Sequence, residues 1–241
     1  MLSEGKNLTP SNPNEGRFVV RLKFKKVGNL QYISHLDLQR TFNRVIKRSG
    51  IPVWYTQGFN PHMKLVFSSP LSIGSESVCE YLDLSMQGDI SCAEIMERLN
   101  RELTDELCIV DAYVAERKFL DIAWADYTCE IFCDGASEEL AKDAEGLLST
   151  SPLNMIKSTK SGEKEIDIVS LIKKAEVSFD AERGVLVIKA RLSATSTSFL
   201  NPEMLISAMK RELGILSGAP SREWYTIMRE ALLDAKEELF I

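Results

Sequence analysis

Hydrophobic and polar positions alternate with two different periods along the chain, and these periods predict its strands and helices. Residues 17–25 alternate apolar side chains with Arg and Lys, which is typical of a half-buried strand. Residues 35–49 instead repeat their apolar positions with the period of a helix that has one buried face. Ser34 and Asp37 predict the start of this helix, and Gly50 predicts its end. Its apolar positions are Leu38, Phe42, Val45 and Ile46.

The rest of the chain repeats the order strand, helix, strand, strand, helix, strand. In the first half we expect extended pieces at 53–56 and 64–68, a strand at 78–86, a helix after Ser91 and a strand at 107–116. After a link at 119–125 we expect a strand at 127–133, a helix at 138–148, an extended piece at 152–158, a charged turn at 160–163, a hairpin from 177–179 to 185–191 and a helix at 201–214. Residues 224–228 fit a last strand, or part of a helix that continues to residue 240.

This order predicts an α+β protein made of two tandem ferredoxin-like (βαββαβ) units with antiparallel sheets. The first unit would span residues 17–118 and the second residues 125–241. Residues 1–16 are polar and contain two prolines, so we expect a disordered tail there. A length of 241 residues is compatible with two domains.

The charge is distributed unevenly, although the whole chain is acidic with a net charge of −6. Residues 17–71 contain ten Lys and Arg but one acid, Asp37, which gives this segment a net charge of +9. A basic segment on an acidic body is a candidate contact surface for a polyanion. The alternative is that these cations pair with the acids of the remainder and form an ordinary solvated face.

The candidate RNA-binding residues lie on the outer face of the first helix and in the loop that follows it. Cations and aromatic residues interleave there, a mixture that neutralises phosphates and stacks bases in single-stranded RNA sites. The aromatic residues could equally belong to the core. The predicted RNA-binding residues are Tyr32, Arg40, Arg44, Lys47, Arg48, Gln57, Gly58, Phe59, Asn60, His62 and Lys64.

The only two histidines, His35 and His62, flank this stretch. Two histidines beside a phosphodiester could serve as base and acid, so they are the candidate catalytic residues. The alternative is that His35 orders the helix start and His62 forms hydrogen bonds within its loop. The usual motifs for a nucleotide, a catalytic metal or an iron–sulfur cluster do not occur, and we expect no cofactor on this chain.

The five cysteines are scattered, without a CxxC pair or a His at ligand spacing, and we expect them to be reduced core residues without a metal. No apolar run approaches the roughly 20 residues that span a bilayer, and the N-terminal residues do not resemble a signal peptide. We therefore expect a cytoplasmic protein without a membrane partner.

Four segments of the chain are distinctive: Tyr32–Leu38, Gly50–Val53, Gln57–Lys64 and, in the second half, Ser161–Ile168. They resemble a bacterial family, the radical-SAM-associated domain of unknown function 2344. Proteins of this family are usually encoded beside, or fused to, a cobalamin-binding radical-SAM protein. The resemblance implies a radical-SAM protein and ribosomal or transfer RNA as partners. More distantly, the fold resembles that of the CRISPR repeat-processing RNA endonucleases, but their glycine-rich loop is not recognisable here.

We therefore expect an RNA-binding accessory module without catalytic activity of its own. One alternative is a metal-independent endoribonuclease that uses His35 and His62. Another is a docking domain that binds a radical-SAM enzyme without contacting RNA.

Overall fold

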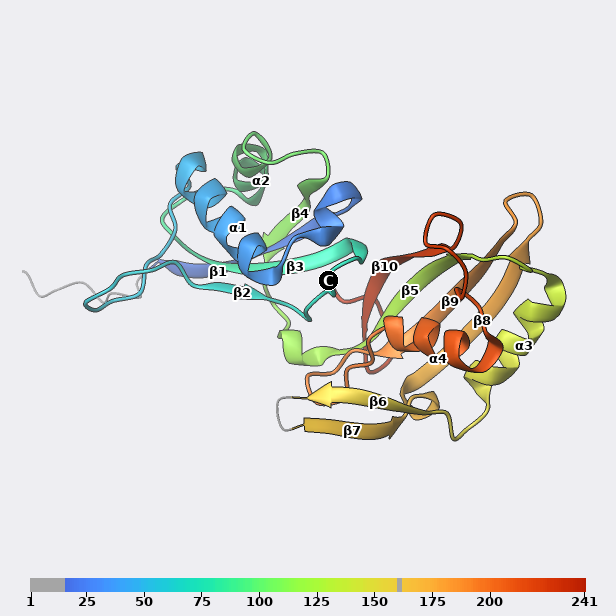
Figure 1. The fold of residues 1–241 in the computed structure, drawn as a ribbon. Coiled ribbons are helices and arrows are strands. Elements are labelled where there is room, and N and C mark those ends of the chain that lie inside the picture. Colours follow the sequence, from blue (N-terminus) through green and yellow to red (C-terminus); the bar gives the residue numbers. More distant parts are fainter. Residues whose placement is uncertain (1–15, 160–161) are drawn as a thin grey trace, which may run out of the picture.

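The computed structural model describes residues 16–159 and 162–241, an α+β protein with a mostly antiparallel sheet. In these residues four α-helices pack against the sheet, and Figure 1 shows them as two pairs, one over each half of the chain. Residues 1–15 of the expected tail and residues 160–161 of the expected turn lie outside the described residues.

The first half places two helices on one face of its strands. Buried side chains of both helices meet Val20, Leu22 and Phe24 in one apolar core. The strands lie in the order β4-β1-β3, with β2 pairing the other edge of β3. The elements are β1 (Arg17–Lys26), η1 (Gly28–Tyr32), α1 (His35–Ser49), β2 (Leu65–Phe67), β3 (Glu76–Gln87), α2 (Cys92–Asn100) and β4 (Leu107–Val114).

The second half has the strand order β10-β5-β9-β8 and a second apolar core under α3 and α4. A separate two-stranded hairpin, β6–β7, follows α3. The elements are η2 (Phe119–Asp121), β5 (Ile122–Phe132), α3 (Glu138–Ser149), β6 (Asn154–Thr159), β7 (Gly162–Asp167), η3 (Val169–Leu171), β8 (Ile172–Asp180), β9 (Val185–Ser193), α4 (Glu203–Leu213) and β10 (Trp224–Asp234).

The two halves share one sheet. β10 pairs β5 over most of its length, and its other edge pairs β3 in parallel at Met228 with Glu76 and at Arg229 with Ser77. The full order is β4-β1-β3-β10-β5-β9-β8, with β2 beside β3. The pairing between the halves is short, and the buried side chain of Arg229 on β10 donates to Glu80 on β3 beside it.

Most of the predicted elements are confirmed, two differ, and one strand, β7, was not expected. The predicted link at 119–125 is wrong beyond η2, since β5 begins at Ile122. Ile122 and Ala125 pack in the core, and β5 pairs with β10 and β9. Residues 53–56 form only isolated bridges, at Val53 and Tyr55. Residues 224–234 form a strand, so the helix that we kept as an alternative there is wrong.

Each of the five cysteines is free in the structure. Cys79 and Cys129 are buried, and burial raises the pKa of both thiols to about 12. Because the thiolate is the reactive form, we expect iodoacetamide to leave these two unmodified in the native protein at pH 8. The three half-buried cysteines, Cys92, Cys108 and Cys133, should react first. Peptide mass spectrometry measures this, with unfolded protein as the control, and modification of native Cys129 as fast as that of Cys92 would contradict the prediction.

Candidate nucleic-acid interface

Helix α1 has the ends and the buried face that the sequence predicts. The Ser34 hydroxyl oxygen accepts a 3.1 Å hydrogen bond from the Asp37 amide, and Gly50 ends the helix in the left-handed conformation. The Asp37 carboxylate accepts from the Ser34 hydroxyl at 2.8 Å rather than from a backbone amide. Hydrogen bonds from Ser34 and Arg40 lower the pKa of Asp37. The buried side chains are Leu38, Phe42, Val45 and Ile46.

Two of the four cations on the outer face of α1 are paired with acids. All four, Arg40, Arg44, Lys47 and Arg48, are exposed. Arg40 Nη1 lies 3.0 Å from Asp37 Oδ1, and Arg48 Nε lies 2.8 Å from Glu102 Oε2 on the segment after α2. Each of these two arginines therefore has an acid beside it, as the solvated-face alternative expects.

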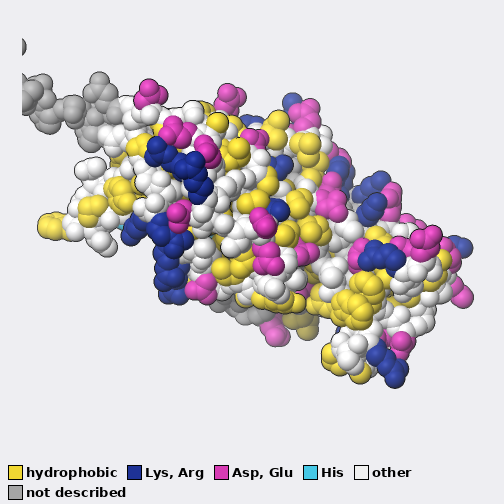
Figure 2. Space-filling model, turned by 90° about the horizontal axis from the view of Figure 1, so that it is seen from above, with side chains coloured by type: hydrophobic (Ala, Val, Ile, Leu, Met, Phe, Trp, Pro, Cys, Tyr) yellow, Lys and Arg dark blue, Asp and Glu magenta, His cyan; other side chains and the backbone are white. Residues whose placement is uncertain are grey.

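The other two cations have no such partner. Arg44 and Lys47 are three positions apart and therefore lie on one side of the helix. Neither forms an ion pair with any of the described residues, and the same is true of Lys64, which precedes β2. Figure 2 shows Lys and Arg side chains in groups over this end of the molecule, each near a few acids. Arg44, Lys47 and Lys64 are hereafter called the unpaired cations.

The other basic residues of the first half are less available than the charge count suggests. Arg21 is fully buried, and its guanidinium donates to Asp83 at 2.7 and 2.9 Å. Lys26 is 3% exposed, and burial lowers its pKa while its ammonium donates to the Gln31 carbonyl at 3.1 Å. The segment's net charge of +9 therefore overstates what a polyanion can contact.

The loop between α1 and β2 projects from the domain, and we call residues 55–64 the arm. Figure 1 shows the arm extending to the left, beyond the helices and the sheet. Its base is closed by a bridge between Tyr55 and Met63 and by the Thr56 amide donating to the His62 carbonyl at 2.9 Å. Gly58 has a φ of +139°, which L side chains rarely adopt, so the tip of the arm requires this glycine.

The predicted aromatic residues of this region are mostly exposed rather than part of the core. Phe59 at the tip of the arm is fully exposed, and Tyr32 and Tyr55 are 66% and 37% exposed. Trp54, by contrast, is 9% exposed, and the Arg17 guanidinium lies over its ring at 3.9 Å. An exposed phenyl ring on a projecting loop is available to stack on another ring system.

The two histidines do not share a site. The His35 ring packs edge-on against Phe67 at 5.2 Å between ring centroids, and its Nε2 lies 3.2 Å from the Gln39 amide nitrogen. The His62 Nδ1 lies 3.0 Å from the Thr56 hydroxyl and 3.1 Å from the Asn60 carbonyl, all within the arm. These contacts fit the structural roles that we considered as the alternative to catalysis.

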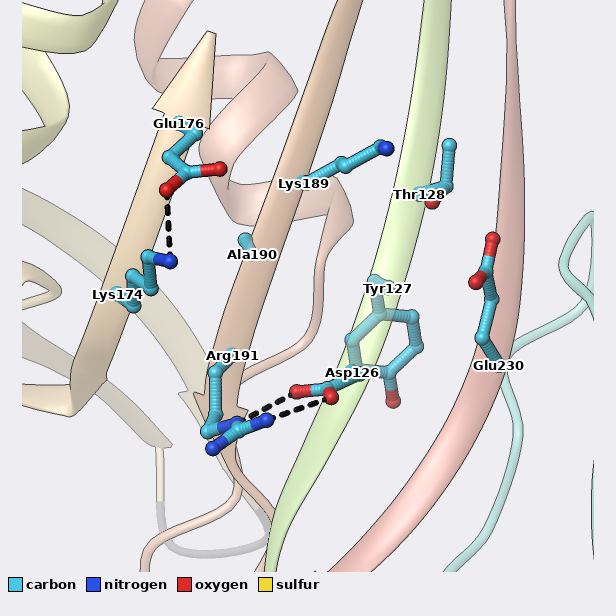
Figure 3. A pocket seen from close by; sticks show the side chains of 9 residues that line it. All are labelled: Asp126, Tyr127, Thr128, Lys174, Glu176, Lys189, Ala190, Arg191 and Glu230. Atoms are coloured by element: carbon cyan, nitrogen blue, oxygen red, sulfur yellow. Dashed lines mark hydrogen bonds and ion pairs between the residues drawn. The ribbon is translucent and has the colours of Figure 1, made fainter. Parts of the chain in front are cut away.

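A hollow of about 220 Å³ lies on the open face of the sheet in the second half. Figure 3 shows Arg191 pairing with Asp126, and Lys174 pairing with Glu176. The closest distance in each pair is 2.7 Å. Since its charges largely neutralise one another, this face is an ordinary solvated sheet surface and a poor phosphate site.

Sequence reasoning missed one feature, a cleft between the halves. Its walls come from residues 67–70, 119–122 and 194–199. The only sequence signal was the polar run before Phe199, which by itself indicates a loop.

Among the described side chains no group of three or more His, Cys, Asp and Glu is placed to hold a metal ion. None of the described helices is long and apolar enough to cross a bilayer.

Comparison with known proteins yields one match to a family. A model described as an uncharacterized protein conserved in bacteria (DUF2344) matches residues 19–202, which include α1, the arm and most of the second half. No curated protein matches the chain.

The similar solved structures are distant. An unknown protein from Galdieria sulphuraria is 10% identical, with a TM-score of 0.27, over 88% of this chain and 98% of that one. DyPB from Rhodococcus jostii RHA1 is 10% identical, with a TM-score of 0.22, over 81% and 83%. The encapsulated DyP-type peroxidase from Mycobacterium smegmatis is 10% identical, with a TM-score of 0.20, over 90% and 88%. Similarities at this level carry no argument about function.

Proposed function

The chain belongs to the DUF2344 family of uncharacterized bacterial proteins. From the surface of this chain we propose that it binds single-stranded RNA through α1 and the arm. The observation that carries the proposal is the exposure of the unpaired cations beside a projecting aromatic loop. Elsewhere in residues 17–71, Arg21 and Lys26 are buried, Arg40 and Arg48 are paired with acids, and the β1 residues Arg17, Lys23 and Lys25 are half-buried.

The geometry suits a strand whose phosphates follow the outer face of α1. Arg44 and Lys47 lie about one helical turn apart, and both are free to contact successive phosphates. The exposed rings of Tyr55 and Phe59 would stack on bases, which needs no particular sequence because every base has a π-face. Gln57 and Asn60, both exposed, add amides that donate and accept hydrogen bonds.

The proposal includes the organisation of the chain as two tandem ferredoxin-like units. In its support, the first half has the order β4-β1-β3-β2 and the second β10-β5-β9-β8. Numbered within each half, and with the β6–β7 hairpin treated as an insertion, both orders read 4-1-3-2, as a split βαβ plan requires. A cytoplasmic location and a radical-SAM partner, both expected from the sequence, belong to the same proposal, as does an RNA of ribosomal or transfer origin.

Reversing the charge of Arg44 and Lys47 tests the proposal. For the variant R44E/K47E we expect RNA affinity to fall by about tenfold or more at 0.15 M salt, since two lost phosphate contacts remove about 1.4 from the slope of log affinity against log salt. Thermal stability should change little, because exposed charges contribute little to folding. The measurement is fluorescence anisotropy of a labelled 12-nucleotide RNA over a series of salt concentrations.

The matched control is K142E/K189E, which makes the same charge change at two exposed positions of the second half. If both double variants weaken binding equally, the effect is one of net charge and the proposed surface is wrong. The variant H35A/H62A should still bind RNA, because the unpaired cations remain. If the wild type cleaves the RNA and H35A/H62A does not, the endoribonuclease alternative replaces this proposal.

A further inference from the structure

A cleft of about 360 Å³ separates the two halves on the side of the molecule where β2 ends. Its three walls are residues 67–70, which lead out of β2, η2 with the start of β5, and residues 194–199, which lead from β9 toward α4. Figure 1 shows these segments converging below the C-terminus, with η2 as the short green helix. Cavities of this size between domains are common ligand sites.

Hydrogen bonds hold two of the three walls in place. The Arg229 guanidinium donates to the Ser69 carbonyl at 3.1 Å, and the Lys157 ammonium donates to the Phe199 carbonyl at 2.6 Å. In addition, the Ala194 amide donates to the Ala123 carbonyl at 2.8 Å. A ligand would therefore enter a cleft whose walls are already fixed, which lowers the entropic cost of binding.

The chemistry of the lining selects the kind of ligand. Among the described residues no charged side chain lines the cleft, although charged residues make up 27% of the chain. The lining combines the rings of Phe67, Phe119 and Phe199 with hydroxyl groups. The Ser68 hydroxyl is enclosed and has no hydrogen-bond partner among the described residues, and Thr195 Oγ1 accepts from the Ser198 amide at 3.0 Å, which leaves its proton free to donate.

We propose that this cleft binds one unpaired nucleobase of the RNA strand, and this inference rests on the proposed function. A base is neutral and planar, so it needs no counter-charge, it stacks on phenyl rings, and its ring edge offers atoms to the hydroxyl groups. The cleft adjoins α1, because the Phe67 ring in its wall packs against His35 in the first turn of that helix. The strand would thus run from the unpaired cations along α1 to the cleft.

Other ligands suit the lining less well. A free phosphate or a nucleotide whose phosphates enter the cleft would meet no cation of the described residues there. An aliphatic side chain of a peptide could not accept a hydrogen bond from the Thr195 hydroxyl, whereas the edge of a base can.

Blocking the entrance of the cleft tests the proposal. Ser196 is exposed and lines the cleft, whereas its neighbour Thr197 is exposed and does not. We expect Ser196→Trp to weaken RNA binding by about five- to a hundredfold, the loss that corresponds to one stacked base. The slope of log affinity against log salt should stay unchanged, because the phosphate contacts remain. The matched control, Thr197→Trp, should bind as the wild type does.

The outcomes separate this proposal from the proposed function. If Ser196→Trp and Thr197→Trp bind RNA equally well, the cleft proposal is overturned while binding along α1 stands. If the wild type binds no RNA, the proposed function fails, and titration with free adenosine and uridine then decides the cleft. The cleft proposal is sustained if these nucleosides change the NMR signals of residues 67–70 and 194–199 in the wild type and Ser196→Trp abolishes the changes. The absence of such changes, or changes caused only by a leucine-rich peptide, would overturn it.

Discussion

Replacing Glu80 by Gln is expected to lower the free energy of unfolding by about 3–5 kcal/mol, since it leaves a buried guanidinium without its counter-charge. Arg229 on β10 is fully buried and donates to Glu80 on β3, with Nε at 2.9 Å from the carboxylate. Burial alone would lower the pKa of Arg229, but the charge of Glu80 outweighs it, and the pKa is raised. Arg229 therefore stays charged across the physiological pH range.

The position of this pair explains why its loss should be felt by the whole molecule. It connects the two strands through which the halves share a sheet, and Arg229 also donates to the carbonyls of Ser69 and Pro70 at 3.1 and 3.4 Å. Urea denaturation measures the effect. The matched control is Glu97→Gln, which breaks an exposed ion pair with Arg101 and should cost at most about 1 kcal/mol.

If Glu80→Gln costs no more than Glu97→Gln, the buried pair is not what holds β3 to β10. The double variant E80M/R229M adds a second measurement. Replacing both charges with apolar side chains removes the unpaired charge, so it should recover part of the stability that Glu80→Gln loses.

A second large effect is expected from Phe240→Ala, which should destabilise the protein by about 3–5 kcal/mol, the usual cost of emptying a buried phenyl site. The Phe240 ring is 1% exposed and packs edge-on against Tyr81 at 5.5 Å between centroids. The Phe240 carbonyl accepts from the Tyr81 hydroxyl at 2.7 Å. The segment after β10 thus covers the face of the first-half sheet that α1 and α2 leave open.

The same ring shields a second buried guanidinium, that of Arg21, whose Cζ lies 4.9 Å from the Phe240 ring centroid and 4.3 Å from that of Phe119. Thermal denaturation compares Phe240→Ala with Leu239→Ala and Ile241→Ala. These neighbours are 61% and 66% exposed, so each should change stability by less than about 0.5 kcal/mol. Equal effects at all three positions would mean that the segment does not cover the sheet in solution.

The candidate site was predictable only in part. Ser34, Gly50 and the apolar stripe place α1 and its outer face, because caps and helical spacing depend on residues within a few positions. The sequence did not reveal which of its cations are free. Arg48 is paired with Glu102, which is 54 positions away in the chain, so only the packing of α2 beside α1 separates it from the unpaired cations.

The cleft between the halves lay beyond sequence reasoning for a similar reason. Ser68 and Thr195 are polar residues in loops, and neither has a pattern of its own that predicts a site. They face one cavity only because β10 joins the two halves into one sheet.

The sequence by itself determined most of the local elements, such as the alternating strand β1 and the capped helix α1. Such features follow from the side-chain period and from contacts between near neighbours in the chain. The tertiary structure decided the rest. The apolar positions of residues 224–234 suit a helix or a strand, and pairing with β5 and β3 selects the strand. Arg229 and Glu80 are 149 positions apart, so their burial as a pair depends on a strand order that no local pattern encodes.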